Sequence, residues 1–460
     1  MSTISKTLAE FTEKLAYGDL PEKVVYQAKR FLLDSVGCAI GATRVHDTQI
    51  YRQILLDQGG TPEATIFGWG DKMSVTNASL LNALLIRGMD FNDIYWKQDP
   101  SHPSDLIPAA LAIAERKRLS GKTLILGIVI AYEFEQRLCE FAFPGIRERK
   151  WHHATLTQFA SPLVAGKMLG LNPDQIVNAM GISACHNYTP GIVAAGKLGM
   201  MKNTVDPLAT QSGVIAALLA EKGYDGPSVV FEGKEGLFEV LGDSGCEFKP
   251  EILTDGLGES FRIMQCSMKG FPTEALTHTF IGTTLSLVRK YDIRPDDVEE
   301  VTVNTIFRAA DILADPSKYK PENKETADHS LPYVVAAAIA DRKVTPASFK
   351  MEKIKDPVIW ELMPKIKAVA LDEFEDAFPA KQMCDVIIRT KDGNAYKEHV
   401  DYPKGDPRNP LDEQDLNDKF DSLTQGMFDE KSLARLKDSI WNVDDFKTVN
   451  AFMATTVSDC

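Results

Sequence analysis

Hydrophobic positions over the first 260 residues repeat mostly with the period of an α-helix. Apolar residues recur at steps of three and four, and alanines lie among them, so that neighbouring helices can approach closely. This pattern predicts helices over residues 123–141, 155–169, 173–185 and 209–222. We therefore expect an all-α helical domain in this part of the chain.

The pattern changes after residue 261. Apolar and polar residues alternate over residues 298–307, which predicts a strand. Two further strand-like runs within residues 385–401 flank a Lys-Asp-Gly-Asn turn, which is typical of a hairpin. Helical patterns cover residues 271–291 and 330–340. Strands and helices together predict a smaller α+β unit.

A chain of 460 residues exceeds one ordinary hydrophobic core. The fold class we expect is mainly α, with a large all-α helical domain and a smaller α+β domain. The first would comprise residues 1–262, and the second residues 263–409. The tail, residues 410–460, is helical in pattern with charged faces, and we expect it to pack back on the all-α domain.

Composition excludes several classes of function. A net charge of −14 argues against a nucleic-acid partner, because phosphate binding needs clustered lysine and arginine. No apolar run is long enough to span a membrane. The seven cysteines are odd in number and scattered, which is typical neither of a disulfide framework nor of a metal or iron–sulfur site. We expect a cytoplasmic protein without a metal, whose binding site for any anion must be locally basic.

The stretch from residue 90 to residue 105 holds the most candidate chemistry. It contains carboxylates, His102 and two prolines between two helical patterns. The prolines bias the residues before them toward extended backbone, so His102 has a defined direction. A histidine beside carboxylates such as Asp90 suits proton transfer. The alternative is a helix cap formed by Ser104 or Asp105, which does not account for Asp90 or His102.

Two basic stretches are further candidates. Residues 147–153 end in two adjacent histidines, which cannot share one helix face and so do not form a two-ligand metal site by themselves. One of them near a helix start could face an anion. Residues 196–204 form a glycine-rich turn with lysines but without the P-loop spacing, and a lysine there could instead hold a carboxylate. Solvated surface charge is the alternative interpretation of both.

The remaining candidates lie in the second half of the chain. Lys269 stands where the composition changes, and clefts between domains are common ligand sites. An ordinary linker lysine is the alternative. Tyr333 follows Asp328 in the stretch Asp-His-Ser-Leu-Pro-Tyr, and the alternative for it is a core aromatic with a satisfied hydroxyl. No G-x-S-x-G, H-E-x-x-H or dinucleotide-binding motif is present.

Together these segments resemble the MmgE/PrpD family of 2-methylcitrate dehydratases, cis-aconitate decarboxylases and iminodisuccinate epimerases. D-F-N-D followed by H-P-S-D, Asp90–Asp93 and His102–Asp105, carries the resemblance, as does D-H-S-L-P-Y, Asp328–Tyr333. Ile94 stands where relatives often have threonine. The resemblance implies a large all-α domain, an α+β lid with the site between them, a homodimer, and no metal or organic cofactor. The site residues that it implies are catalytic Asp90, His102, His153 and Tyr333, and substrate-binding Lys202 and Lys269.

The function that follows is that of a lyase. It would remove a proton α to a carboxylate of a small polycarboxylate and eliminate water, as 2-methylcitrate dehydratase does. Lys202 and Lys269 could neutralise that carboxylate while one group acts as base and another as acid; which residue is which stays open. An isomerase, epimerase or decarboxylase on a related acid is the alternative. A non-catalytic helical interaction protein is disfavoured by the charged groups of all five segments.

Overall fold

The computed structural model describes residues 2–195, 198–242 and 245–458. Gly196 and Lys197 of the glycine-rich turn, and Cys460, lie outside the described residues. Helix makes up 59% and strand 11% of the structure, so the fold is mainly α with some sheets, as expected. None of the described helices is both long enough and apolar enough to cross a bilayer.

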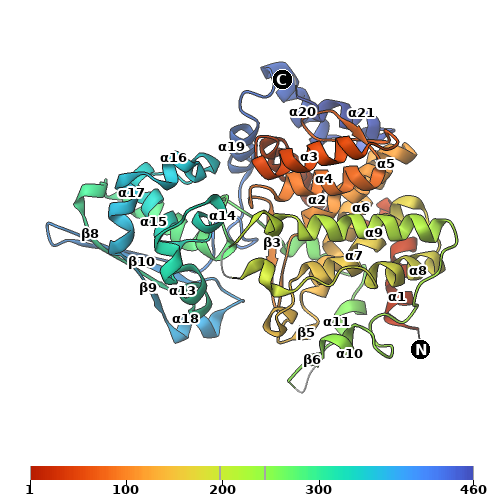
Figure 1. Cartoon of the computed structure of the whole chain (residues 1–460), viewed down its shortest axis with the longest axis horizontal. Coiled ribbons are helices and arrows are strands. Elements are labelled where there is room, and N and C mark those ends of the chain that lie inside the picture. The colour runs from red at the N-terminus through yellow and green to blue at the C-terminus, as the bar shows by residue number, and fades with distance from the viewer. Residues whose placement is uncertain (1, 196–197, 243–244, 459–460) are drawn as a thin grey trace.

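The first part of the chain is a set of closely packed helices (Figure 1). Its helices are α1 (Ile4–Lys14), α2 (Glu22–Ala42), α3 (His46–Gln58), α4 (Val75–Arg87), α5 (Ile107–Lys117), α6 (Gly121–Leu138), α7 (Ala154–Leu169), α8 (Pro173–Ala184), α9 (Val205–Glu221), α10 (Leu237–Leu241) and α11 (Glu251–Thr254). The small residues act as expected: a Cβ on Gly213 of α9 would meet the Ser161 hydroxyl of α7 at 2.1 Å. The four helices predicted here are confirmed, with ends shifted by four residues or fewer.

A four-stranded sheet dominates the second part. Its order is β11-β10-β8-β9, with β8 (Val298–Thr305) antiparallel to β10 (Cys384–Thr390) and parallel to β9 (Ile366–Ala370). β10 and β11 (Ala395–Val400) form the predicted hairpin. β9 is short and mostly exposed, so its sequence pattern did not predict a strand.

Helices accompany this sheet. They are α12 (His278–Lys290), α13 (Phe307–Leu313), α14 (Lys324–Ala327), α15 (Leu331–Asp341), α16 (Met351–Ile354), α17 (Pro357–Leu362) and α18 (Asp372–Ala377). The predicted helix over residues 271–291 begins only at His278. Before it, the Glu274 carboxylate accepts the backbone N–H of Leu276 at the start of a 3₁₀ turn, which leaves residues 271–274 irregular.

Buried hydrophobic residues form two clusters, one in each part. The C-terminal helices α19 (Glu413–Thr424), α20 (Glu430–Trp441) and α21 (Val449–Met453) belong to the first cluster, so the chain returns to the helical part (Figure 1). A Cβ on Gly37 of α2 would lie 2.8 Å from the ring of Phe420, which shows how closely α19 packs. The domain boundaries stay a prediction.

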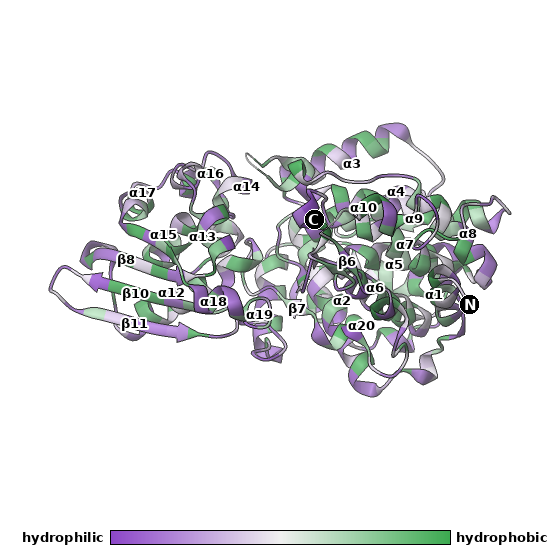
Figure 2. Cartoon of the chain, turned by 90° about the horizontal axis from the view of Figure 1, so that it is seen from below, coloured by the Kyte–Doolittle hydropathy of each residue, from purple (hydrophilic) through white to green (hydrophobic). Residues whose placement is uncertain are grey.

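A small sheet lies where the two parts meet. In it β3 (Asp93–Trp96) pairs with β4 (Pro100–Ser101) and with β7 (Ser267–Met268). Figure 2 shows β7 and α19 between the two halves of the molecule. This pairing brings the stretch that contains Asp90 and His102 beside the segment that carries Lys269. Shorter two-stranded sheets are β1 (Ala64–Thr65) with β2 (Lys72–Met73) and β5 (Ala142–Phe143) with β6 (Glu247–Phe248).

Candidate active site

Three cations converge on the buried carboxylate of Asp90. This residue follows α4 with a φ of 52°, a left-handed conformation that turns its side chain back toward Arg87. Its Oδ1 lies 2.5 Å from Arg87 Nη1 and 2.7 Å from Lys269 Nζ, and its Oδ2 lies 2.7 Å from Lys202 Nζ. The tertiary structure therefore gathers three segments that are far apart in the sequence.

This network fixes the charge of Asp90. Burial opposes ionisation, but Lys202, Lys269 and Arg87 together hold the pKa of the Asp90 carboxyl well below its usual range. A carboxylate that binds protons so weakly is a poor base. In the structure Asp90 pairs with both lysines and holds their ammonium groups in place.

Arg87 extends the network to two more carboxylates. Its Nε lies 3.6 Å from Asp105 Oδ2 and 4.0 Å from Asp206 Oδ2. The same Asp206 oxygen lies 3.4 Å from His153 Nε2, so the arginine and the histidine share it. Arg87 was not among the residues expected from the sequence, and its place on α4 looks like an ordinary position near a helix end.

The turn that carries His102 is fixed by hydrogen bonds between Asp93 and Ser104. The Asp93 carboxylate accepts the Ser104 hydroxyl at 2.6 Å and the Ser104 backbone N–H at 3.0 Å, which fixes the turn around His102. α5 begins only at Ile107, so neither Ser104 nor Asp105 caps it as the alternative interpretation expected.

The tautomer of His102 follows from its partner. Its Nδ1 lies 2.7 Å from the backbone oxygen of Asp93. A carbonyl oxygen only accepts, so Nδ1 carries the hydrogen and Nε2 keeps a lone pair when the ring is neutral. Burial, followed by the charges of Arg87 and Lys269, lowers the pKa of His102 well below its usual value. His102 is therefore a neutral imidazole that can accept a proton at Nε2.

His153 and His152 lie beside it. The rings of His102 and His153 are 5.5 Å apart between centroids, and those of His152 and His153 are 3.9 Å apart. His152 Nδ1 accepts the backbone N–H of Ala154 at 3.2 Å, which places the hydrogen of the neutral ring on Nε2. Burial and the neighbouring His153 lower the pKa of His152 well below its usual value.

One group of the described residues has the side chains to hold a metal ion. The ligand atoms of His152, His153 and Asp206 lie within 4.8 Å of one another. The Asp206 oxygen already faces Arg87 at 4.0 Å and His153 at 3.4 Å. A divalent cation would lie close to that guanidinium, and the repulsion makes the contact between His153 and Asp206 a better account of this group than a metal site.

Five of the six residues expected from the sequence line one cavity of about 70 Å³; they are Asp90, His102, His153, Lys202 and Lys269. Tyr333 does not line it. Its hydroxyl donates to the backbone oxygen of Ser348 at 2.5 Å, and its ring packs near Phe349 in the second hydrophobic cluster. The structure therefore places Tyr333 as a core aromatic with a satisfied hydroxyl. The reason is that α15 is buried on every side through Ile339, so helical pattern alone did not show which way this residue faces.

The cavity also contains groups that the sequence analysis missed. His329 lines it with its Nδ1 2.5 Å from Asp328 Oδ1, and Asp328 Oδ2 accepts from Lys324 at 3.0 Å. Burial and Lys202 lower the pKa of His329 to about 4. The signal was present in the Asp-His-Ser stretch, where Tyr333 was preferred to the histidine.

Glu274 is the second missed group. Burial raises the pKa of its carboxyl to about 7, against the opposing charge of Lys269. Its backbone N–H donates to the Asp328 backbone oxygen at 3.1 Å, which ties it to the segment of His329. A carboxyl that keeps its proton near neutral pH is suited to act as a general acid.

Lys419 of α19 holds the two main site segments together. Its Nζ donates to the backbone oxygens of Phe91 at 2.6 Å and Lys269 at 2.8 Å, and pairs with Asp34 Oδ1 at 2.6 Å. These three acceptors match the three hydrogens of an ammonium group. Two of them are backbone atoms, so nothing in the sequence pointed to this residue.

Two family models match this chain. The MmgE/PrpD N-terminal domain matches residues 6–249, and the MmgE/PrpD C-terminal domain matches residues 271–445. The chain belongs to the MmgE/PrpD family. This confirms the resemblance found in the sequence.

Relatives with known names match over most of their length. A cis-aconitate decarboxylase of Aspergillus terreus is 24% identical over 96% of this chain and 94% of its own. Cis-aconitate decarboxylase of Homo sapiens is 26% identical over 97% and 93%, and 2-methylcitrate dehydratase of Salmonella typhimurium is 25% identical over 86% and 84%. Both names denote lyases, at nearly equal identity, so the site has to distinguish the two reactions.

Proposed function

We propose that this protein is a lyase that acts on a small polycarboxylate without a cofactor, removes a proton α to a carboxylate and eliminates water. The observation that carries the proposal is the neutral His102, whose Nε2 has a free lone pair in the cavity that Lys202 and Lys269 also line. Such a group is a base at neutral pH.

The cavity is locally basic in an acidic protein. Four cationic side chains line it, Arg87, Arg147, Lys202 and Lys269, against two carboxyls, Asp90 and Glu274. A substrate carboxylate near the lysines would share them with Asp90. Neutralising that carboxylate stabilises the enolate-like dianion that forms when the adjacent C–H bond breaks, and fixed cations in a buried site do this well.

The proposed elimination uses two groups of this chain. His102 Nε2 takes the proton from the carbon next to the carboxylate, and the C–H electron pair becomes the new carbon–carbon double bond. The bond to the hydroxyl on the neighbouring carbon breaks, and protonated Glu274 gives its proton to that hydroxyl, which leaves as water. The base and the acid thus begin in the protonation states that their pKa shifts favour.

Decarboxylation is the second candidate, because the cis-aconitate decarboxylases match more of this chain than the Salmonella dehydratase does. In that reaction a carbon–carbon bond breaks, CO₂ leaves, and a proton from Glu274 goes to the remaining carbon. Decarboxylation does not require a base to remove a proton from carbon, so it would leave the neutral His102 without a role. We therefore prefer elimination of water.

The test is incubation with 2-methylcitrate, citrate and cis-aconitate, followed by ultraviolet absorbance of unsaturated acid, product mass and CO₂ release. Loss of water without CO₂ supports the proposal. Release of CO₂ supports the second candidate, and solvent deuterium in an otherwise unchanged hydroxy acid supports an epimerase. Absence of all three, over a range of di- and tricarboxylates, contradicts the function.

The remaining features of the proposal are a homodimer in the cytoplasm, with neither a metal nor an organic cofactor, and no nucleic-acid or membrane partner. Residues 1–262 and 410–460 would form the all-α domain, with residues 263–409 as a lid over the cavity. Dialysis against a strong chelator should leave activity intact, whereas loss that zinc or iron restores would assign a metal to His152, His153 and Asp206. Light scattering of the purified protein measures the dimer.

A further inference from the structure

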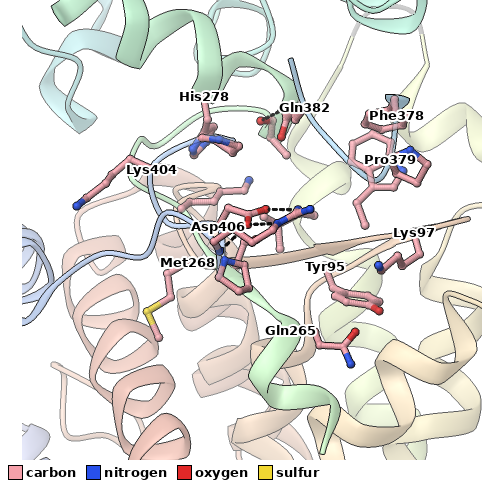
Figure 3. A pocket seen from close by; sticks show the side chains of 18 of the residues that line it. Tyr95, Lys97, Gln265, Met268, His278, Phe378, Pro379, Gln382, Lys404 and Asp406 are labelled. Carbon is pink, nitrogen blue, oxygen red and sulfur yellow. Dashed lines mark hydrogen bonds and ion pairs between the residues drawn. The ribbon is translucent and has the colours of Figure 1, made fainter. Parts of the chain in front are cut away.

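A second cavity of about 320 Å³ adjoins the catalytic one (Figure 3). Its walls come from β3, β7, the start of α12, the Phe378–Pro379 turn and the loop around Asp406, so it lies where the two hydrophobic clusters meet. Ligand sites commonly have volumes of about 300–1,000 Å³. The cavity is therefore large enough for a small organic molecule.

The lining of this cavity carries an excess of positive charge. Four cationic side chains, Lys97, Lys269, Lys404 and Arg408, face one carboxylate, Asp406. Arg408 and Asp406 neutralise each other through Nε–Oδ1 and Nη2–Oδ2 contacts of 2.7 and 2.8 Å. Lys269 is engaged with Asp90. The two other lining cations are Lys97 and Lys404.

These two lysines differ in whether their ammonium groups form ion pairs with carboxylates. Lys404 Nζ lies 2.7 Å from Asp415, and both side chains are partly exposed. Lys97 is exposed, and within the described ranges its ammonium group has neither a hydrogen bond nor an ion pair. Figure 3 shows the two lysines at opposite ends of the cavity. Lys97 is thus the one lining cation without a carboxylate partner among the described residues, and in a chain of net charge −14 such a group favours an anion.

Part of the remaining lining is aromatic or apolar, beside polar side chains such as Gln265 and Gln382. The rings of Trp96 and Phe378 meet edge to face with centroids 5.7 Å apart, and Pro379 follows Phe378 in the wall. Aromatic and proline surfaces of this kind pack well against a planar apolar group. The ligand chemistry that fits is an anionic group on a ring-sized apolar body.

A third cavity, of about 550 Å³, provides a contrast. Its charged lining residues are balanced, with three cationic side chains, Arg147, Lys150 and Arg308, and three acidic ones, Glu148, Asp311 and Glu375. It therefore has no surplus charge to select an anion. The excess of cationic over acidic lining residues therefore distinguishes the second cavity from the third.

We propose that the second cavity binds an organic anion that carries a carboxylate or a phosphate on a ring-sized apolar body, separately from the catalytic cavity. Lys97 pairs with the anionic group, and Trp96 and Phe378 pack on the ring. Ile94, Trp96, Lys269 and Ala275 line both cavities, so an occupant touches the wall of the catalytic one. This goes beyond the proposed reaction and does not depend on it.

The test is calorimetric titration of the full-length protein with phenyl phosphate and with phenylacetate, which separate phosphate from carboxylate. Inorganic phosphate and phenol, the two halves of phenyl phosphate, are titrated separately for comparison. At least one complete probe should bind with one site per chain and more tightly than either half. Failure of both to bind at millimolar concentration overturns the proposal.

Variants locate the site. Lys97→Met should weaken binding about two- to fivefold, as expected for an exposed ion pair, and Phe378→Ala should weaken it as well. Lys222→Met, on the exposed end of α9, is the matched control and should have no effect. Lys202 does not line the second cavity, so Lys202→Met should leave binding unchanged. Equal affinities in the Lys97 and Lys222 variants, or loss of binding in the Lys202 variant, would place the ligand elsewhere and refute the proposal.

Discussion

The two sides of the candidate active-site cavity hold carboxyl groups whose pKa values shift in opposite directions. On the helical side, Asp90 faces three cations and stays ionised. On the side of the second hydrophobic cluster, Glu274 is buried with less compensation, and its pKa rises to about 7. Two like groups thus have different tasks, because one holds charge in place and the other can supply a proton.

The comparison extends to the histidines. On the helical side, a backbone oxygen orients His102, and on the other side a carboxylate, Asp328, orients His329. Both rings are neutral because burial lowers their pKa values. Only when both parts of the molecule are in place does the cavity contain a base, fixed cations and a proton donor, so the proposed chemistry belongs to neither part alone.

The largest effect is expected from removing the base of the helical side. His102→Asn keeps polarity and approximate size but cannot take a proton, so kcat should fall by about 10²- to 10⁴-fold. The measurement is kcat beside a thermal melt, with His46→Asn on the exposed start of α3 as the control. If kcat holds while the melting temperature drops, His102 is a structural residue.

The acid of the other side is tested next. Glu274→Gln cannot donate a proton, and kcat should fall by about 10²-fold. In the unaltered enzyme the protonated, active form of Glu274 is lost as pH rises through about 7, so kcat should decline above that pH. The lowered pKa of His102 keeps the base active well below pH 6.5. A pH profile of both proteins is the check: the alkaline decline should be absent in the variant, and its persistence would assign the acid to another group.

Removing the positive charge of Lys202 or Lys269 should reduce the rate less than removing either proposed proton-transfer group, His102 or Glu274. Lys202→Met or Lys269→Met removes a charge-assisted contact worth about 1.5–3 kcal/mol, so kcat/KM should fall at least roughly tenfold. Lys222→Met provides the control. Unchanged steady-state kinetics in both site variants would mean that these lysines pair with Asp90 and do not bind the substrate.

The smallest effect is expected at Tyr333, which lies away from both sides of the cavity. Tyr333→Phe removes one buried hydrogen bond to Ser348, at a cost of about 1 kcal/mol in the free energy of unfolding. kcat/KM should stay within about twofold. Urea unfolding and steady-state kinetics measure the two quantities. A large loss of kcat without loss of stability would show that Tyr333 takes part in the reaction.

The sequence alone indicated the local structure and most of the candidate site residues of the helical side. Helical and alternating periods located the helices and the β10–β11 hairpin, because a buried face imposes its repeat on the residues that form it. The stretch around His102 stood out because prolines, carboxylates and a histidine fall close together in the chain. The family resemblance singled out Lys202 on a turn that looks like an ordinary surface loop, and it supported Lys269, which already stood out where the composition changes.

Only the tertiary structure decided which groups meet. β9 pairs with β8 across about sixty residues, and its short, mostly exposed pattern did not reveal it. Glu274 and His329 reach the cavity because the second part of the chain packs against the first, and Tyr333 turns away because α15 is buried all round. Lys419 binds backbone oxygens, which every residue has. A sequence pattern records what each segment buries, whereas the partner and the facing direction depend on how distant segments pack.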